Sequence, residues 1–140
     1  MAPVKYLLDT NVLSELIKPE PNPQVARLLS LRGTACATAS VVWQELWFGC
    51  LRLPPSHRRQ IIESYLSRLG ASQLPVLAYD STSAKIHAHL RADLSARGLA
   101  ASQADGEIAS VALRWGLRVV SRNVRHFEVF PDLLAENWFE

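Results

Sequence analysis

Residues 5–16 read KYLLDTNVLSEL, and this stretch decides the class of fold. The segment KYLL at residues 5–8 predicts a short buried strand, and the pattern at residues 10–17 predicts a helix that follows it at once. Asp9 lies at the junction between the two. In parallel sheets, ligands bind beyond the carboxyl ends of the strands, so Asp9 is the first candidate functional residue.

The rest of the chain continues this alternation. Further helices are predicted at residues 22–31, 41–51, 56–69, 81–96 and 103–115, and further strands at residues 34–39, 75–78 and 117–121. Ser40 and Asp80 are expected to cap the helices that follow them, and the residues after 121 are expected to form an irregular tail. Strands that alternate with helices predict an α/β fold with a parallel sheet covered on both faces. No repeat or linker divides the chain, so a single domain is expected over residues 1–140.

The composition excludes several classes of protein. Of the 140 residues, 49% are hydrophobic and 20% are charged, and the net charge is +2, which is the balance of a globular domain in water. The start lacks the apolar region and cleavage site of a signal peptide, and no apolar run approaches the roughly 18 residues of a membrane helix. A cytoplasmic protein with no membrane contact is therefore expected. Cys36 and Cys50 stand apart in apolar surroundings, which argues against zinc or redox chemistry.

Each acidic candidate has a structural as well as a functional interpretation. Asp9 is well placed to cap the helix that follows it, although one carboxylate oxygen can cap while the other faces a cation. Asp80 is interpreted as a helix cap, and Glu107 as a solvated side chain.

Glu45, within SVVWQELWFG, shares its helix face with small or apolar residues three and four positions away. Because Trp43 and Trp47 lie on the opposite side, the helix is apolar almost all round and is expected to be buried. An ionised carboxylate there is costly unless a partner compensates its charge. The alternatives are that Glu45 reaches solvent or pairs with an arginine.

Asp105 opens the helix at residues 103–115. Ser102 and Asp105 have the spacing of a capping box, which is the structural alternative. The face beneath Asp105 carries only small residues, namely Ala101, Ala109, Ala112 and Gly116. Such a face allows close approach to the sheet, and it predicts that Asp105 points inward.

Three carboxylates gathered about 4 Å apart would repel by roughly 4 kcal/mol per pair at an effective dielectric of 20. Divalent cations remove that cost, and ligands that are all oxygen favour Mg²⁺ or Mn²⁺. Such a site suits phosphodiester hydrolysis, because one metal lowers the pKa of a bound water and a second stabilises the leaving oxygen.

Three segments together resemble the PIN-domain ribonuclease toxins called VapC, especially the FitB-like branch. They are LLDTNVLSEL at residues 7–16, QEL at residues 44–46, and DGEIASVALRWGLRVVSRNVRHF at residues 105–127. Their order and spacing match over nearly the whole chain. The resemblance implies a three-layer α/β/α sandwich with a four- or five-stranded parallel sheet. It also implies a Mg²⁺-dependent endoribonuclease, the toxin of a type II toxin–antitoxin system, that forms a homodimer and is neutralised by a cognate antitoxin.

The resemblance also assigns roles to residues. Asp9, Glu45 and Asp105 match the first, second and third metal-binding acids of the family. Other matching residues are expected to support these acids. Thr10, by its hydroxyl, and Asn11, by its amide, are expected to hold the carboxylate of the first acid. Ser121 stands where the family has threonine, and Asn123 matches an asparagine that contacts water or metal.

One departure from the family pattern concerns the second metal. His126 stands where the family usually has an aspartate, and a neutral imidazole does not supply the same charge. One metal held by three acids is therefore expected, with His126 free to contact phosphate when protonated. Arg122 and Arg125 are candidate phosphate contacts on an RNA loop or single strand, or else ordinary surface arginines.

Two other surfaces have candidate roles. The segment LRLPPSHRR at residues 51–59 is interpreted either as a solvated loop or as a basic surface that faces RNA or an acidic partner. Trp43 and Trp47 are candidates for antitoxin binding or self-association, and equally for the core.

Two rival functions remain. A phosphatase of the haloacid dehalogenase type needs a second aspartate two residues after the first, where this chain has Asn11. It also needs a lysine in a suitable segment, which this chain lacks, so the phosphatase is disfavoured. A non-catalytic partner and co-repressor of a DNA-binding antitoxin is the second rival, and the replacement at His126 favours it.

Overall fold

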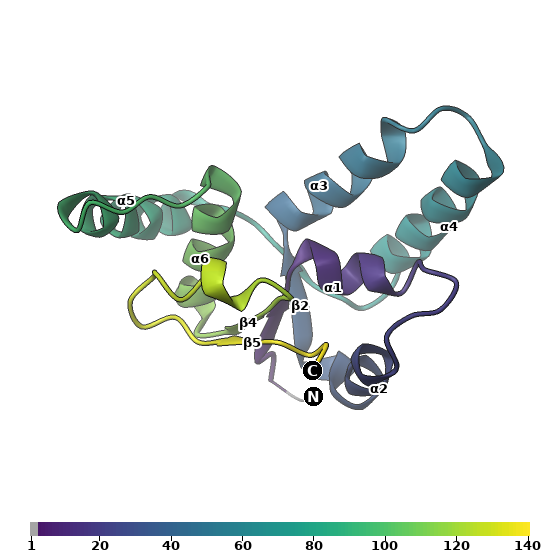
Figure 1. Cartoon of the computed structure of the whole chain (residues 1–140), viewed down its shortest axis with the longest axis horizontal. Helices are drawn as coiled ribbons and strands as arrows, with labels where there is room; N and C mark the ends of the chain where they lie inside the picture. The colour runs from purple at the N-terminus through teal and green to yellow at the C-terminus, as the bar shows by residue number, and fades with distance from the viewer. Residues whose placement is uncertain (1–2) are drawn as a thin grey trace.

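Five short strands form one parallel sheet in the computed structural model, which describes residues 3–140. The sheet order is β3-β2-β1-β4-β5, and the strands are β1 Tyr6–Leu8, β2 Cys36–Ala39, β3 Val76–Leu77, β4 Arg118–Val120 and β5 Ala135–Glu136. The α-helices are α1 Thr10–Glu15, α2 Pro23–Arg32, α3 Ser40–Leu51, α4 His57–Ala71, α5 Ser81–Ala96 and α6 Gln103–Trp115. Two 3₁₀ helices are η1 Gly33–Ala35 and η2 Val124–His126. The predicted α/β fold, a parallel sheet flanked by helices, is confirmed (Figure 1).

Strand β1 lies at the centre of the sheet because both of its faces are apolar. Leu7 and Leu8 are 0% and 1% exposed, and successive side chains of a strand point to opposite faces. Each buried leucine contributes about 1.5–3 kcal/mol of hydrophobic free energy. Leu8 pairs with Val120 of β4. Asp9 and Ser121, the residues that directly follow these two strands, therefore lie at the same edge of the sheet.

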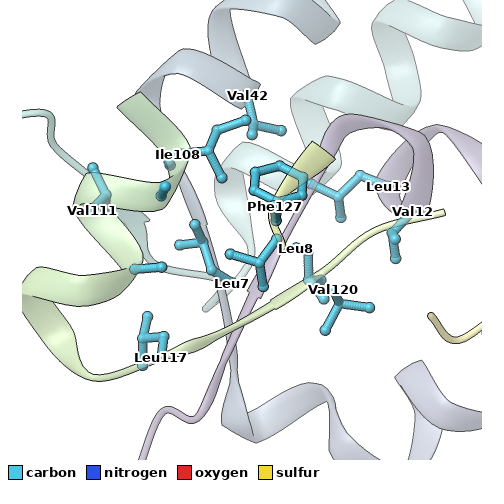
Figure 2. Close-up of a cluster of buried hydrophobic side chains, with 14 of the residues drawn as sticks. Leu7, Leu8, Val12, Leu13, Val42, Ile108, Val111, Leu117, Val120 and Phe127 are labelled. Carbon is cyan, nitrogen blue, oxygen red and sulfur yellow. The ribbon is translucent and has the colours of Figure 1, made fainter. Parts of the chain in front are cut away.

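The core joins the central strands to the helices around them. Figure 2 shows apolar side chains from β1, β4, α1, α3, α6 and the segment around Phe127 converging, including Leu7, Leu8, Val12, Leu13, Val42, Ile108, Val111, Leu117, Val120 and Phe127. Helix α6 contributes its predicted small-residue face, on which Ala109 and Ala112 are fully buried. It ends at Gly116, whose φ of 67° is the left-handed cap conformation that favours glycine.

Two helix pairs extend from the sheet in Figure 1: α3 with α4, and α5 with α6. In the first pair, a Cβ added at Gly70 of α4 would lie 3.1 Å from the Trp43 ring, so this tryptophan packs inside the pair. Trp47 contacts Trp43 edge-on, with ring centroids 6.2 Å apart. This packing favours the core interpretation of both tryptophans. No helix of the described residues is both long and apolar enough to span a membrane.

Several predictions of local structure are wrong. Helix α3 begins at Ser40 itself, and the Ser40 hydroxyl accepts a hydrogen bond from the Tyr79 backbone N–H at 3.2 Å instead of capping the helix. The same helix is not buried all round, because Phe48 and Leu51 are 58% and 52% exposed. The tail is not wholly irregular, since β5 adds an edge strand and Trp138 beyond it is buried. Two residues are too few for a strand pattern to show in sequence.

Candidate functional site

Asp9 lies between the end of β1 and the start of α1, and both of its oxygens are hydrogen-bonded. Oδ1 accepts from the Thr10 backbone N–H at 2.8 Å, and Oδ2 accepts from the Ser121 hydroxyl at 2.7 Å. The residue is 8% exposed. Asp9 is therefore both the helix cap that sequence suggested and a buried carboxylate held across the β1–β4 boundary.

Ser121 receives further support from its neighbours. The Asn11 side-chain amide donates to the Ser121 hydroxyl oxygen at 3.4 Å, and the Asn123 backbone N–H donates to it at 3.0 Å. Asn11 also accepts from the Arg122 backbone N–H at 3.0 Å. The Asn11 amide thus acts on the first carboxylate through Ser121, whereas direct support had been expected.

Glu45 lies in the middle of α3 and faces α1. Its Oε2 accepts a hydrogen bond from the Thr10 hydroxyl at 2.9 Å. The Thr10 hydroxyl, expected at the first acid, therefore supports the second one. Helix α3 buries Val42, Leu46 and Cys50 beneath this region, which leaves Glu45 half-buried at the boundary of the core.

Asp105 lies in the first turn of α6. Its backbone N–H donates to the Ser102 hydroxyl at 3.1 Å, so the cap that Ser102 was expected to form is present. The Asp105 carboxylate stays available, and its Oδ2 lies 3.7 Å from His126 Nδ1. The capping and functional interpretations are again compatible, because they use different atoms.

Electrostatics link the three acids. Burial raises the pKa of Asp9, hydrogen bonds from Ser121 and Thr10 oppose that rise, and the negative charge of Asp105 adds to it. Burial also raises the pKa of Glu45; the Thr10 hydrogen bond opposes the rise, and the charges of Asp9 and Asp105 increase it.

Since charges act on one another measurably only over short ranges in water, the three carboxylates share one electrostatic environment. Glu107, which sequence placed on a solvated face, also raises the pKa of Glu45. Its charge is a feature of the site that the helical spacing alone did not reveal.

The donor chemistry of this site fits a hard divalent cation, since carboxylate, hydroxyl and amide oxygens surround it and both cysteines are buried elsewhere. The positions of the candidate metal ligands fit a bound ion less well than their chemistry does. Across residues 3–140, no three His, Cys, Asp or Glu side chains are grouped closely enough to hold a metal ion. Thr10 and Ser121 instead hold the carboxylates of Glu45 and Asp9 as separate, mutually repelling groups.

The basic candidates beside the acids differ in their surroundings. Arg125 and His126 are exposed and line a cavity of about 360 Å³ together with Asp105. The Arg122 side chain instead stacks 4.0 Å from the Phe139 ring centroid and lies 3.9 Å from the Glu15 carboxylate.

Two other polar segments have structural roles. Asp80 caps α5 by accepting from the Ser83 N–H at 2.8 Å and pairs with Arg114 at 3.0 Å, which lowers the Asp80 pKa to about 2. That cap was expected. In the segment at residues 51–59, Arg59 binds Glu63 at 2.8 Å.

A parallel α/β sheet with Asp9 at the carboxyl end of β1, and with Glu45 and Asp105 on α3 and α6, defines the class to which this chain belongs. It is a member of the PIN domain family, whose model matches residues 6–132.

Curated relatives refine the match. The chain is 34% identical to "Ribonuclease VapC2" of Haemophilus influenzae over 136 residues, covering 96% of this chain and 98% of that protein. It is 32% identical over 136 residues to the "tRNA(fMet)-specific endonuclease VapC" of Salmonella typhimurium, covering 96% and 98%. It is also 32% identical over 140 residues to "Toxin FitB" of Neisseria gonorrhoeae, covering 96% and 99%.

Solved structures agree with this placement. The chain superimposes on a chain of FitAB bound to an IR36 DNA fragment with a TM-score of 0.86 at 28% identity, covering 96% of each chain. A DNA-bound VapBC from Salmonella typhimurium gives a TM-score of 0.82 at 32% identity, covering 96% of this chain and 98% of that one. The expected resemblance to VapC and FitB proteins is confirmed.

Proposed function

We propose that this chain is a Mg²⁺-dependent endoribonuclease and the toxin of a type II toxin–antitoxin system, acting in the cytoplasm. The observation that carries the proposal is the placement of Asp9, at the end of β1, within electrostatic reach of Glu45 and Asp105 on neighbouring helices: the Asp105 charge raises the pKa of Asp9, and the charges of Asp9 and Asp105 raise the pKa of Glu45. Carboxyl groups whose pKa is raised by burial and by neighbouring negative charges are a feature of functional sites, and a cation relieves such repulsion. The ribonuclease and endonuclease names of the VapC relatives support the same conclusion.

The metal site would be formed by the oxygens of Asp9, Glu45 and Asp105, with Mn²⁺ able to replace Mg²⁺. When bound, the metal supplies a water of lowered pKa and stabilises negative charge on the phosphate. The chain itself positions the ligands: Ser121 holds Asp9, and Thr10 holds Glu45. Such supporting hydrogen bonds fix the orientation of ligating carboxylates.

The substrate contacts follow from the exposed groups around Asp105. Arg125 and His126 line the same cavity as this acid, and a guanidinium pairs well with phosphate. Asn123 is exposed two residues after Ser121 and can contact a water or phosphate oxygen. Arg122 is the weaker candidate, because its guanidinium already lies against Phe139 and near Glu15. Unpaired RNA presents its backbone to such groups more readily than a helix does.

A cleavage assay tests the proposal. Purified wild type should cleave single-stranded RNA with Mg²⁺ and lose activity in EDTA. Asp9→Asn, Glu45→Gln and Asp105→Asn should each lower the rate at least about 100-fold, since even supporting residues of a metal site contribute 10- to 100-fold. Glu20→Gln is the matched control, because Glu20 is exposed and its charge is not among those that act on Asp9 or Glu45. Equal cleavage by wild type and the three variants would identify a contaminating nuclease and contradict the proposal.

A cognate antitoxin is the proposed partner, because solved relatives are VapBC and FitAB complexes. A groove of about 340 Å³ runs beside Glu45 and carries apolar walls and two basic side chains, Lys18 and Arg58. Such a groove fits a partner segment with apolar and acidic side chains. We also propose a homodimer, which light scattering would detect as twice the 15.6 kDa of one chain.

One observation favours a second function, a non-catalytic co-repressor. His126 occupies the position of a family acid and faces Asp105 at 3.7 Å, and the solved FitAB and VapBC relatives are bound to DNA. Under this alternative, wild type cleaves no RNA with Mg²⁺ or Mn²⁺, yet it strengthens the binding of its antitoxin to promoter DNA.

A further inference from the structure

A second cavity adjoins the site from the other side of the first turn of α6. It has a volume of about 250 Å³ and lies between α5, the connection at residues 97–102 and α6. Ala100, Ala101 and Ser102 line both this cavity and the one that contains Asp105. A molecule bound at Asp105 can therefore extend into the second cavity without leaving the protein surface.

His87 is a buried polar residue in the lining of this cavity. It is 4% exposed, and its Nδ1 lies 2.8 Å from the Tyr79 hydroxyl. Its Nε2 faces Gly106, where an added Cβ would lie only 2.3 Å away. No hydrogen bond to Nε2 is found within residues 3–140, where the fully buried side-chain polar atom without a partner is Ser83 Oγ and not this nitrogen. Nε2 therefore keeps some contact with the cavity and has no protein partner that a ligand would displace.

The hydrogen bond to Tyr79 determines what this nitrogen offers. Burial raises the pKa of Tyr79 and lowers the pKa of His87, so the phenol is protonated and the imidazole is neutral near pH 7. A phenol hydroxyl is the better donor of the two and an imidazole nitrogen the better acceptor, so we assign donation from Tyr79 to Nδ1. The proton of the imidazole then lies on Nε2, which presents an N–H donor to the cavity.

The other walls add one more strong donor and flat apolar contacts. Arg91 lines the cavity and is exposed, and its positive charge acts on His87. Leu94 and Phe130 form buried apolar walls, and Leu99 is 46% exposed at the edge. A ligand with apolar faces and two adjacent acceptors matches this lining.

We propose that this cavity is a guanine subsite for the RNA substrate, in which Arg91 and His87 Nε2 donate hydrogen bonds to O6 and N7 of an unstacked base. The inference rests on the proposed ribonuclease function and adds a base preference to it. Guanine presents O6 and N7 side by side, and arginine is the side chain that most often reads them. A cavity of about 250 Å³ is just below the usual range of small-ligand pockets, which suits one base better than a whole oligonucleotide.

Direct binding is tested on the metal-free protein by NMR titration with GMP, AMP, CMP, UMP and inorganic phosphate. GMP should shift the ring signals of His87 and Tyr79, and the other nucleotides should bind about tenfold more weakly, as one good pair of base contacts allows. Equal shifts with inorganic phosphate alone, or no shift with GMP, would overturn the guanine assignment.

Cleavage provides a second test, with short RNAs that carry a single guanine at successive positions. Wild type should prefer one position of the guanine relative to the cut, and Arg91→Ala and His87→Ala should lose that preference with a raised KM. The matched controls are Arg68→Ala and His89→Ala, which are exposed residues outside the cavity. Arg91 is exposed, so its variant tests the idea even if His87→Ala does not fold.

The outcomes separate the two hypotheses. RNA cleavage that depends on Asp9 but is indifferent to Arg91 and His87 would reject the guanine subsite and leave the nuclease intact. An absence of cleavage by wild type would contradict the nuclease, and the GMP titration would still decide whether the cavity binds the base.

Discussion

Removing the Ser121 hydroxyl should destabilise the protein in a way that depends on pH. Ser121 is fully buried and donates to Asp9 Oδ2 at 2.7 Å. A hydrogen bond to a charged group contributes about 1.5–3 kcal/mol, and one between neutral groups about 0.5–1.5 kcal/mol. Ser121→Ala should therefore lower the free energy of unfolding by about 1.5–3 kcal/mol at neutral pH, where the carboxylate is ionised.

The sign of the pH dependence follows from the direction of the pKa. The pKa of Asp9 is raised by burial, so the stability that Asp9 contributes is fully present below its unfolded pKa and is lost as the pH rises through its folded pKa. The Ser121 hydrogen bond lowers that folded pKa and so offsets part of the loss. Without it, the pKa of Asp9 rises further. The penalty for Ser121→Ala should be largest at neutral pH and should shrink to about 0.5–1.5 kcal/mol in acid buffer.

Urea unfolding of the metal-free protein at both pH values measures this difference. Ser110→Ala is the matched control, because Ser110 is equally buried but donates to the neutral Gly106 carbonyl. Its penalty should be about 1 kcal/mol at either pH. Ser121→Thr should restore the bond, since threonine keeps the hydroxyl. A Ser121→Ala penalty that is absent, or equal at both pH values, would refute the assigned bond to an ionised Asp9.

Three further predictions concern other contacts. Gly106→Ala should destabilise the fold by about 1–3 kcal/mol through overpacking against His87, and adding His87→Ala should recover most of this loss in a thermal unfolding cycle; strict additivity would refute the contact. His126→Asp should restore the family acid beside Asp105 and increase the number of Mn²⁺ ions bound in calorimetry, whereas an unchanged stoichiometry would count against that role. Asp80→Ala should destabilise the protein at neutral pH but lose its effect as the pH falls through about 2, because the low pKa of Asp80 stabilises the fold only while the carboxylate is ionised.

The elements that sequence predicted well are those whose signals are local. A strand ending in Asp9, helices closed by caps or glycine, and alternating strands were sufficient for the parallel sheet. The bounds moved by one or two residues at most ends, as fraying ends do. Strand β5 was missed because it has two residues and owes its place to pairing with β4.

The site was harder to predict in its details, because they depend on which elements become neighbours. Sequence named Thr10 as a support for the first acid, Asp9, but the approach of α1 to α3 directs its hydroxyl to Glu45. Glu107 was assigned to solvent from helical spacing, yet its charge acts on Glu45 across the gap between two helices. No sequence pattern encoded either contact.

The central position of β1 has a consequence for the synthesis of this protein. Asp9 is made before Ser121, whose hydroxyl holds it and which lies 112 positions later in the chain. Ribosomes release the chain in order, so the acidic pocket stays unfinished until β4 has left the exit tunnel. A product that terminates before β4 lacks this closure, and its Asp9 carboxylate is left without the hydrogen bond from Ser121.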